Sequence, residues 1–248
     1  MDASHVREVI ARIDPDGEPA IEFVKRAEFT GPRLGVFASS FNPTTVAHVE
    51  LMRRAAKEFL LDEILALAGA ANADKSAYEC SLEDRLRMLA LTFETEPRVS
   101  IGVSSHAFFV DMIDALGRAY PRKTDLHFVV GFDTFERVID REDRYTPKYR
   151  RKFCDRVGAL RFLLVRSRLI VAARRGAGAP DIRALVEGEL PELAGRISYL
   201  DTPADIVEMS ATEVRDRLRA GLAIDGLVPP AVELYIKEQG LYRGGKFR

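Results

Sequence analysis

Residues 35–51 (GVFASSFNPTTVAHVEL) bring together side chains that suit the binding of a phosphate group. The apolar residues before Ser39 predict a strand, and apolar residues at helical spacing after Thr45 predict a helix. The first backbone N–H groups of a helix lack intrahelical partners, and the helix dipole favours negative charge there. The stretch therefore predicts an anion site in which His48, in the first helical turn, adds an imidazole to the backbone amides.

A second stretch, residues 209–215 (MSATEVR), has the same chemistry late in the chain. Ser210 or Thr212 is placed to cap a helix, and the planar fork of Arg215 suits phosphate oxygens. Alone, this is also the pattern of an ordinary capped helix with an arginine in solvent. Together with the first stretch, it predicts that Arg215 lies in a first helical turn, outside the core, and binds the same phosphates as His48.

Basic residues follow two more predicted strands, at residues 63–68 and 160–165. Lys75 comes after the first of these strands and Arg166 after the second. Ligands of an open parallel sheet bind beyond the carboxyl ends of its strands, so we expect both residues at that edge. The plain alternative for Lys75 is a solvated surface lysine.

Gly131 and Asp133 follow the apolar strand predicted at residues 126–130. A glycine there allows close approach of the backbone to a ligand, and a carboxylate can accept hydrogen bonds from ribose hydroxyls. Alternatively, Asp133 caps a helix that begins at Thr134, and the two roles are compatible.

Continuous apolar strands separated by helices indicate a parallel sheet buried on both faces. We therefore expect an α/β fold, a Rossmann-like doubly wound parallel sheet with helices on both faces. Strands are also predicted at residues 99–103 and 197–200, and helices at residues 82–93 and 108–120. Residues 1–32 read as an N-terminal extension that packs on the main domain, which spans residues 33–248 and is helical from about residue 208.

Composition excludes several classes of function. A formal net charge of −1 provides no general field for nucleic acid or an acidic membrane, so neither is expected as a partner. Two cysteines, Cys80 and Cys154, form no metal-binding pattern and no disulfide framework. With no apolar run near ~18 residues and no signal peptide, we expect a cytoplasmic protein, with a homo-oligomer possible.

The sequence from Phe41 to His48 resembles the F-x-P-x-[H/T]-x-x-H signature of nucleotidyltransferases with a HIGH-type motif. Asn42 before the proline and Thr45 in place of the first histidine look most like nicotinamide or nicotinate mononucleotide adenylyltransferases. Residues 209–215 resemble the second signature of this family, I-S-S-T-x-x-R, with Met209 for Ile and Ala211 for Ser. The resemblance covers roughly residues 33–242, where residues 226–242 look like the usual C-terminal helix, and it departs at Ala47, where many relatives have Gly or Met.

The region that would select the second substrate departs further. Relatives place a tryptophan shortly after Gly-x-Asp to stack on the pyridine ring, whereas this chain has no tryptophan. Tyr145, with Arg144 before it, can take that place because tyrosine also has an aromatic face. Phe108 is a second candidate for contact with this substrate, although core packing also explains both aromatic residues.

The resemblance implies adenylyl transfer, in which the phosphate of a mononucleotide attacks the α-phosphate of ATP and pyrophosphate leaves. It implies catalytic roles for His48, Lys75 and Arg215, and contacts with the ATP phosphates by a larger set: Ser39, Phe41, Thr45, Ser210 and Thr212. Mg²⁺ would be held mainly by ATP and water, without a metal site of the protein.

Three alternatives stay open. Another phosphorylated acceptor is possible, as in related cytidylyltransferases and pantetheine-phosphate adenylyltransferases. A dinucleotide-dependent oxidoreductase would share the sheet, but residues 35–43 lack its G-x-G-x-x-G pattern. A nucleotide-binding regulator with a decayed site is the alternative outside the enzymes.

Overall fold

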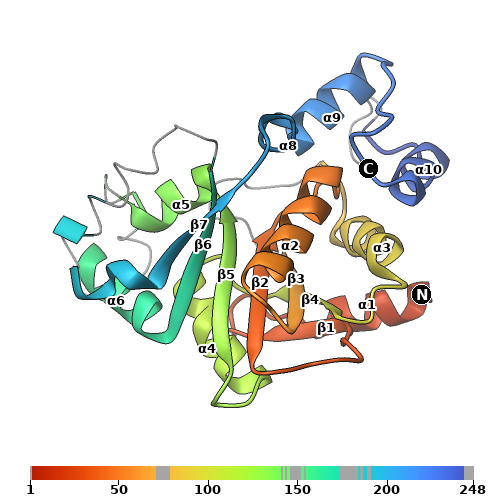
Figure 1. The fold of residues 1–248 in the computed structure, drawn as a ribbon. Coiled ribbons are helices and arrows are strands. Elements are labelled where there is room, and N and C mark those ends of the chain that lie inside the picture. Colours follow the sequence, from red (N-terminus) through yellow and green to blue (C-terminus); the bar gives the residue numbers. More distant parts are fainter. Residues whose placement is uncertain are drawn as a thin grey trace.

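The computed structural model describes residues 2–70, 79–140, 142, 144–145, 152–153, 155–173, 184, 187–188 and 191–242. Within these residues, seven strands form one sheet in the order β1-β4-β3-β2-β5-β6-β7 (Figure 1). The strands are β1 (Ile21–Lys25), β2 (Arg33–Ser39), β3 (Glu63–Gly69), β4 (Val99–Ser104), β5 (Asp125–Gly131), β6 (Ser167–Ala173) and β7 (Ile197–Asp201).

The strands from β2 onward are parallel, and β1 joins the edge antiparallel to β4. Counted from β2, the parallel strands follow the doubly wound order 3-2-1-4-5-6. In this order the chain turns to opposite sides after β2 and β5, and the carboxyl ends of such neighbouring strands are where sheets of this kind generally bind ligands. The backbone pairing of β2 with β5 extends to Val36 opposite Phe128. Each strand continues for three more residues, to Ser39 in β2 and to Gly131 in β5.

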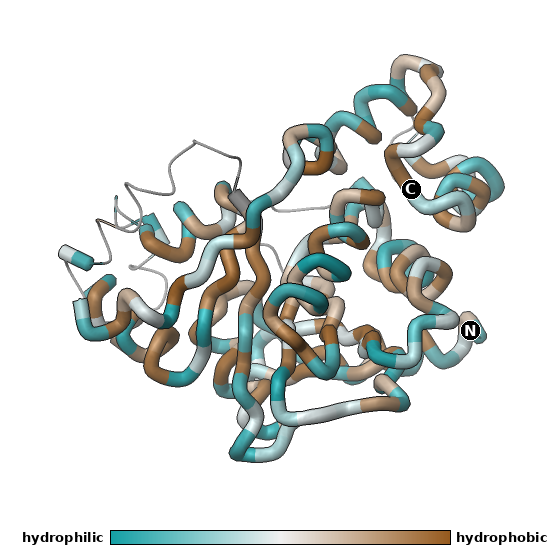
Figure 2. The backbone as a smooth tube through the Cα atoms, viewed as in Figure 1, coloured by the Kyte–Doolittle hydropathy of each residue, from teal (hydrophilic) through white to brown (hydrophobic). Residues whose placement is uncertain are grey.

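Helices cover both faces of the sheet. Their bounds are α1 (Ala3–Ala11), α2 (Val46–Glu58), α3 (Leu82–Phe93), α4 (Phe109–Ala119), α5 (Phe132–Ile139) and α6 (Arg156–Arg166). One hydrophobic cluster joins the sheet to α1, α2 and α3, and another joins the opposite face to α4, α5 and α6. Figure 2 shows hydrophobic stretches on β5 and β6 and a hydrophilic outer side on α2. The expected fold class is therefore confirmed, with the antiparallel edge strand as an addition.

The residues before β2 belong to this architecture. Val6 and Val9 of α1 are buried in the same cluster as α3, and β1 extends the sheet. The predicted packing of the N-terminal segment against the rest of the chain is confirmed, and Ile21–Lys25 of this segment is a strand of the sheet.

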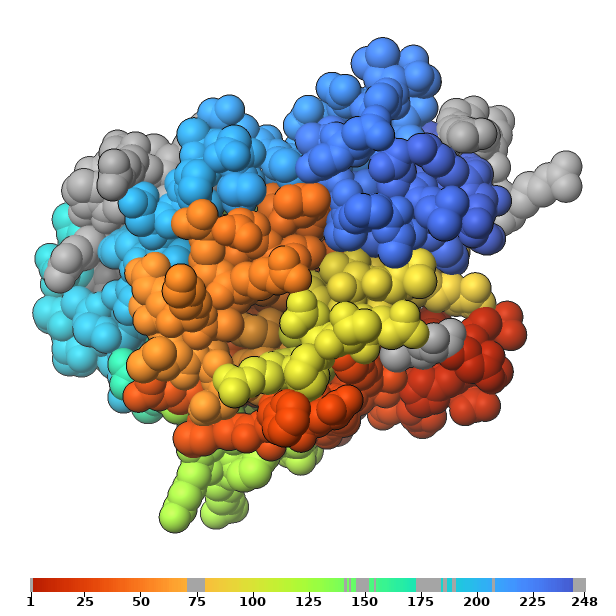
Figure 3. Space-filling view, turned by 45° about the vertical axis from the view of Figure 1, so that its right-hand side comes forward, coloured from red at the N-terminus to blue at the C-terminus, as the bar shows by residue number. Residues whose placement is uncertain are grey.

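The C-terminal residues form a helical module. After the 3₁₀ helix η2 (Pro191–Arg196) and β7 come α8 (Ala204–Glu208), α9 (Ala211–Arg219) and α10 (Pro230–Gln239). Val214 and Ile236 share a third buried cluster with Met88 of α3. Figure 3 shows the C-terminal residues lying directly against α2 and α3.

One sequence prediction about the sheet is wrong. Residues 160–165 are not a strand but part of α6, which Asp155 caps by accepting a hydrogen bond from the Gly158 amide at 2.7 Å. The strand is the following segment, β6, which pairs with β5. Arg166 therefore precedes its strand and lies at the opposite end of the sheet from the predicted site, with its guanidinium over the Phe162 ring.

None of the described helices combines the length and the apolar character that crossing a bilayer requires.

Candidate functional site

His48 is fixed in the first turn of α2 by a reciprocal cap. Thr45 is the N-cap residue; its hydroxyl accepts from the His48 amide at 3.3 Å, and its own amide donates to His48 Nδ1 at 3.0 Å. The imidazole lies beside the rings of Phe37 and Phe41, with centroids 5.8 and 5.1 Å away. The predicted start of the helix near Thr45 is thus confirmed, and His48 is held from both its backbone and its ring.

The contacts of His48 define its charge and tautomer. Burial lowers the pKa of His48 to about 4, so the ring is neutral at physiological pH. Because Nδ1 accepts from Thr45, the proton resides on Nε2, which lies 3.3 Å from Ser39 Oγ at the end of β2. His48 therefore presents a neutral N–H donor beside the Ser39 hydroxyl.

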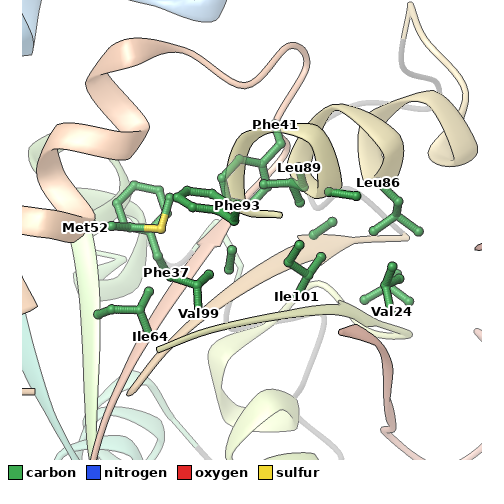
Figure 4. Close-up of a cluster of buried hydrophobic side chains, with 14 of the residues drawn as sticks. Val24, Phe37, Phe41, Met52, Ile64, Leu86, Leu89, Phe93, Val99 and Ile101 are labelled. Carbon is green, nitrogen blue, oxygen red and sulfur yellow. The ribbon is translucent and has the colours of Figure 1, made fainter. Parts of the chain in front are cut away.

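The turn between β2 and α2 rests on the core. Phe41 has a φ of 47°, unusual for a residue other than glycine, and its side chain is fully buried. Figure 4 shows Phe41 together with Leu89 and Phe93 of α3. The Phe41 ring therefore anchors the turn in the core. Because the side chain is buried, only the backbone of Phe41 could contact a phosphate.

Arg215 joins the two predicted signatures. Its Nη1 donates to the Asn42 carbonyl at 2.7 Å, although the two residues are 173 positions apart. The residue is 6% exposed and lies in the second turn of α9, since that helix begins at Ala211. The prediction that Arg215 lies in the first helical turn and outside the core is therefore wrong. The contact with Asn42 nevertheless brings residues 209–215 next to residues 35–51.

The guanidinium of Arg215 makes two further hydrogen bonds. Nε donates to Glu79 Oε1 at 2.9 Å, and Nη2 donates to Thr212 Oγ1 at 3.1 Å. A guanidinium has five N–H groups, so within the described residues about two remain for another acceptor. Partial burial acts to raise the pKa of Glu79, but the hydrogen bond from Arg219 and the positive charge of Arg215 outweigh it and lower that pKa. The ionised Glu79 carboxylate balances the positive charge of the two arginines.

Ser210 and Thr212 take the positions that the sequence predicts at the start of α9. Ser210 is the N-cap residue, and its hydroxyl accepts from the Glu213 amide at 3.1 Å. Both residues are exposed, while the Thr212 hydroxyl also orients Arg215. At the start of α2, two of the first three backbone amides already have protein acceptors: Val46 donates to the Leu227 carbonyl, and His48 donates to Thr45. These two amides are therefore not available to an anion.

Gly131 and Asp133 lie at the end of β5, the strand next to β2. Among the residues that the structure describes, nothing lies within 4 Å of the position that a Gly131 Cβ would take, so this part of the chain leaves the backbone open to a close neighbour. Helix α5 begins at Phe132 and its N-cap is Gly131, with no side-chain cap. The alternative in which Asp133 caps a helix from Thr134 is therefore wrong, and its carboxylate is exposed.

The structure brings Phe108 and Tyr145 together. Their rings meet edge to face with centroids 6.5 Å apart, and the Arg144 guanidinium lies 5.5 Å from the Tyr145 ring centre. Asp140 accepts from the Tyr145 amide at 3.0 Å, and Tyr145 is buried whereas Phe108 is partly exposed. Lys75 lies outside the described residues, so its predicted role stays a prediction.

Three further residues shape this site, although the sequence analysis assigned none of them a role in it. Arg85 of α3 is buried and its Nη1 donates to the carbonyls of Ser40 and Gly69, at 2.9 and 3.0 Å, which ties the ends of β2 and β3 together. The other two are Glu79 and Asn42. Arg85 could have been found in the sequence, because it is an arginine on the apolar face of an otherwise regular amphipathic helix. No local pattern marks Glu79.

The chain is similar to known proteins both in sequence and in fold. Residues 36–217 match the family model described as cytidylyltransferase-like. A probable nicotinate-nucleotide adenylyltransferase of Gemmatimonas aurantiaca is 32% identical, over 85% of this chain and 92% of that protein. One from Dehalococcoides mccartyi is 28% identical, over 85% and 97%. The nicotinic acid mononucleotide adenylyltransferase of Plasmodium falciparum, solved with NaAD, has the same fold, with a TM-score of 0.62, 17% identity and coverage of 86% and 98%.

Proposed function

The chain belongs to the cytidylyltransferase-like family, in its nicotinate-nucleotide adenylyltransferase group, and we propose that it adenylylates a pyridine mononucleotide. In this reaction the phosphate of nicotinate or nicotinamide mononucleotide attacks the α-phosphate of ATP. A dinucleotide forms and pyrophosphate leaves. The contact between Arg215 and the Asn42 carbonyl carries this proposal, because it unites both phosphate-binding stretches at one place.

The substrate supplies its own nucleophile, so the protein has to align two anions and stabilise the leaving pyrophosphate. His48 contributes the Nε2–H donor, and Arg215 contributes its remaining N–H groups. Ser39, Ser210 and Thr212 add hydroxyls at the same edge of the sheet. We place the nucleotide ribose near Gly131 and Asp133, and the pyridine ring near Phe108 and Tyr145.

Mg²⁺ enters this proposal as part of MgATP. Among the described residues no three His, Cys, Asp or Glu side chains gather as a metal site, and the donors at the rim suit anions rather than cations. The metal would therefore be held by phosphate oxygens and water, where it neutralises charge on the triphosphate.

Pyrophosphate release from MgATP tests the proposal with a panel of acceptors: nicotinate mononucleotide, nicotinamide mononucleotide, pantetheine phosphate and a phosphorylated sugar alcohol. We expect release with one or both pyridine mononucleotides. Release with another acceptor, and none with either pyridine nucleotide, would assign the chain to a different branch of the family.

A further inference from the structure

The C-terminal module is attached to the phosphate-binding turn at more than one point. Besides the contact from Arg215, the Val46 amide donates to the Leu227 carbonyl at 2.9 Å. The third contact comes from the far end of the module, where the Tyr242 hydroxyl donates to Asn42 Oδ1 at 2.8 Å. Asn42 thus receives one hydrogen bond on its backbone oxygen and another on its side-chain oxygen.

This last contact is shielded from water. Asn42 is 5% exposed and Tyr242 is 7% exposed. The tyrosine ring packs in the cluster of Val214, Ile236 and Met88, which also holds α9 and α10 on α3. Burial raises the pKa of Tyr242, so the phenol keeps its proton and remains a donor.

Tyr242 and Arg215 therefore hold the same residue from one packed module. If the Asn42 side chain lost its partner, the turn carrying Phe41 to Thr45 could shift relative to Arg215. His48, capped by Thr45, would move with it. Small displacements of this kind are costly where two anions must be aligned.

Resting on the proposed function, we propose that Tyr242 is a positioning residue for nucleotide binding and transfer. Its hydroxyl sets the position of the Asn42 turn against the C-terminal module, and so the spacing between the His48 and Arg215 donors. Tyr242 itself does not need to touch the nucleotide.

The test is Tyr242→Phe, which keeps the buried ring and removes the hydroxyl. Tyr235→Phe is the matched control, because Tyr235 is in the same cluster but its hydroxyl donates to Asp84 of α3 at 2.7 Å rather than to Asn42. Calorimetry with MgATP measures affinity independently of the acceptor, and thermal unfolding measures any loss of stability. We expect Tyr242→Phe to raise the Kd for MgATP about 3- to 10-fold, the range of one hydrogen bond, and Tyr235→Phe to leave it within about 2-fold.

Turnover then completes the test. With the acceptor found by the panel, we expect Tyr242→Phe to lower kcat by about tenfold, and to add nothing further when combined with Asn42→Ala. A Kd within about 2-fold of wild type, or an equal rise in both tyrosine variants, would overturn the proposal. The proposed function fails separately, if wild-type protein binds MgATP but turns over no pyridine mononucleotide.

Discussion

His48 is a neutral residue in the folded protein, which distinguishes it from a simple cationic phosphate ligand. Its Nδ1 is occupied by Thr45, and its Nε2–H is left to donate. A neutral donor adds little to ground-state binding of a triphosphate but can strengthen as charge develops on the leaving group. This favours a role for His48 in the transition state over one in affinity.

The same burial predicts how stability depends on pH. The pKa of His48 falls from 6.5 to about 4 on folding, so below pH ~6.5 the unfolded chain binds a proton that the folded chain does not. Stability is therefore lost as pH falls from about 6.5 to about 4. Between pH 7 and pH 4.5 we expect wild type to lose about 2–3 kcal/mol more unfolding free energy than His48→Gln.

Urea denaturation of the two proteins at both pH values measures this difference. All other histidines are shared, so their contributions cancel in the comparison. Equal losses in the two proteins would mean that the imidazole titrates in the folded state as it does in the unfolded chain.

At the scale of elements, helix α2 links stability to activity through its cap. Thr45 is 1% exposed, and it satisfies both the His48 amide and the His48 ring. We expect Thr45→Ala to lower the unfolding free energy by about 1–2 kcal/mol and also to lower kcat, because the imidazole loses its orientation. Thr45→Ser keeps the hydroxyl and should retain most of both.

Helix α3 provides the matched control for this prediction. Ser81 caps α3 by accepting from the Asp84 amide at 3.0 Å. Ser81→Ala should cost a similar free energy of unfolding, measured by urea denaturation, with kcat nearly unchanged. A similar fall in kcat for both caps would show that the activity follows stability rather than the placement of His48.

The elements also show what local sequence patterns can predict. The strands with continuous apolar runs, and the helices with a cap residue and a regular apolar stripe, are where the sequence places them. Residues 160–165 misled because five of these six residues are apolar, and a short apolar run does not separate a strand from a buried helix face. The cap at Asp155, with leucines at helical spacing after it, was the better guide.

The site was predictable where its geometry is local. Thr45 and His48 are three residues apart in one turn of helix, so their relation follows from helix geometry. Arg215 was chosen for its chemistry, but its burial depends on Glu79 and Asn42, 136 and 173 residues away. Tyr242 is 200 residues from its partner, and no local pattern encodes such a contact.

At the scale of the whole molecule, the site is assembled from opposite ends of the sequence. The first strand of the parallel sheet and its helix supply His48, and the C-terminal module supplies Arg215. Figure 1 shows α9 and α10 beside α2 and α3, away from α5 and α6. If the proposed function holds, the phosphate site is complete only when this module is docked on α2 and α3.

This arrangement predicts that His48 and Arg215 are energetically coupled through one phosphate chain. His48→Ala should lower kcat by about 10²–10³, the cost of removing one preorganised donor, with little loss of folded protein at pH 7. Arg215→Ala should lower kcat similarly and also destabilise the fold by about 1–3 kcal/mol, because its buried hydrogen bonds to Asn42 and Glu79 are lost. Arg219→Ala removes the more exposed arginine partner of Glu79 and serves as its control, with kcat near wild type.

The double variant decides whether the two donors act together. If both serve the same phosphates, the loss in kcat for His48→Ala with Arg215→Ala should fall short of the product of the two single losses. Turnover must be measured below the unfolding transition of Arg215→Ala, so that the coupling is not a by-product of unfolded protein. Fully multiplicative losses would place the two residues at separate steps or separate sites. If both donors act on one leaving group, the double loss must be smaller than the product of the single losses. Once one donor is removed, the leaving group is no longer aligned with the other, so removing the second donor costs less.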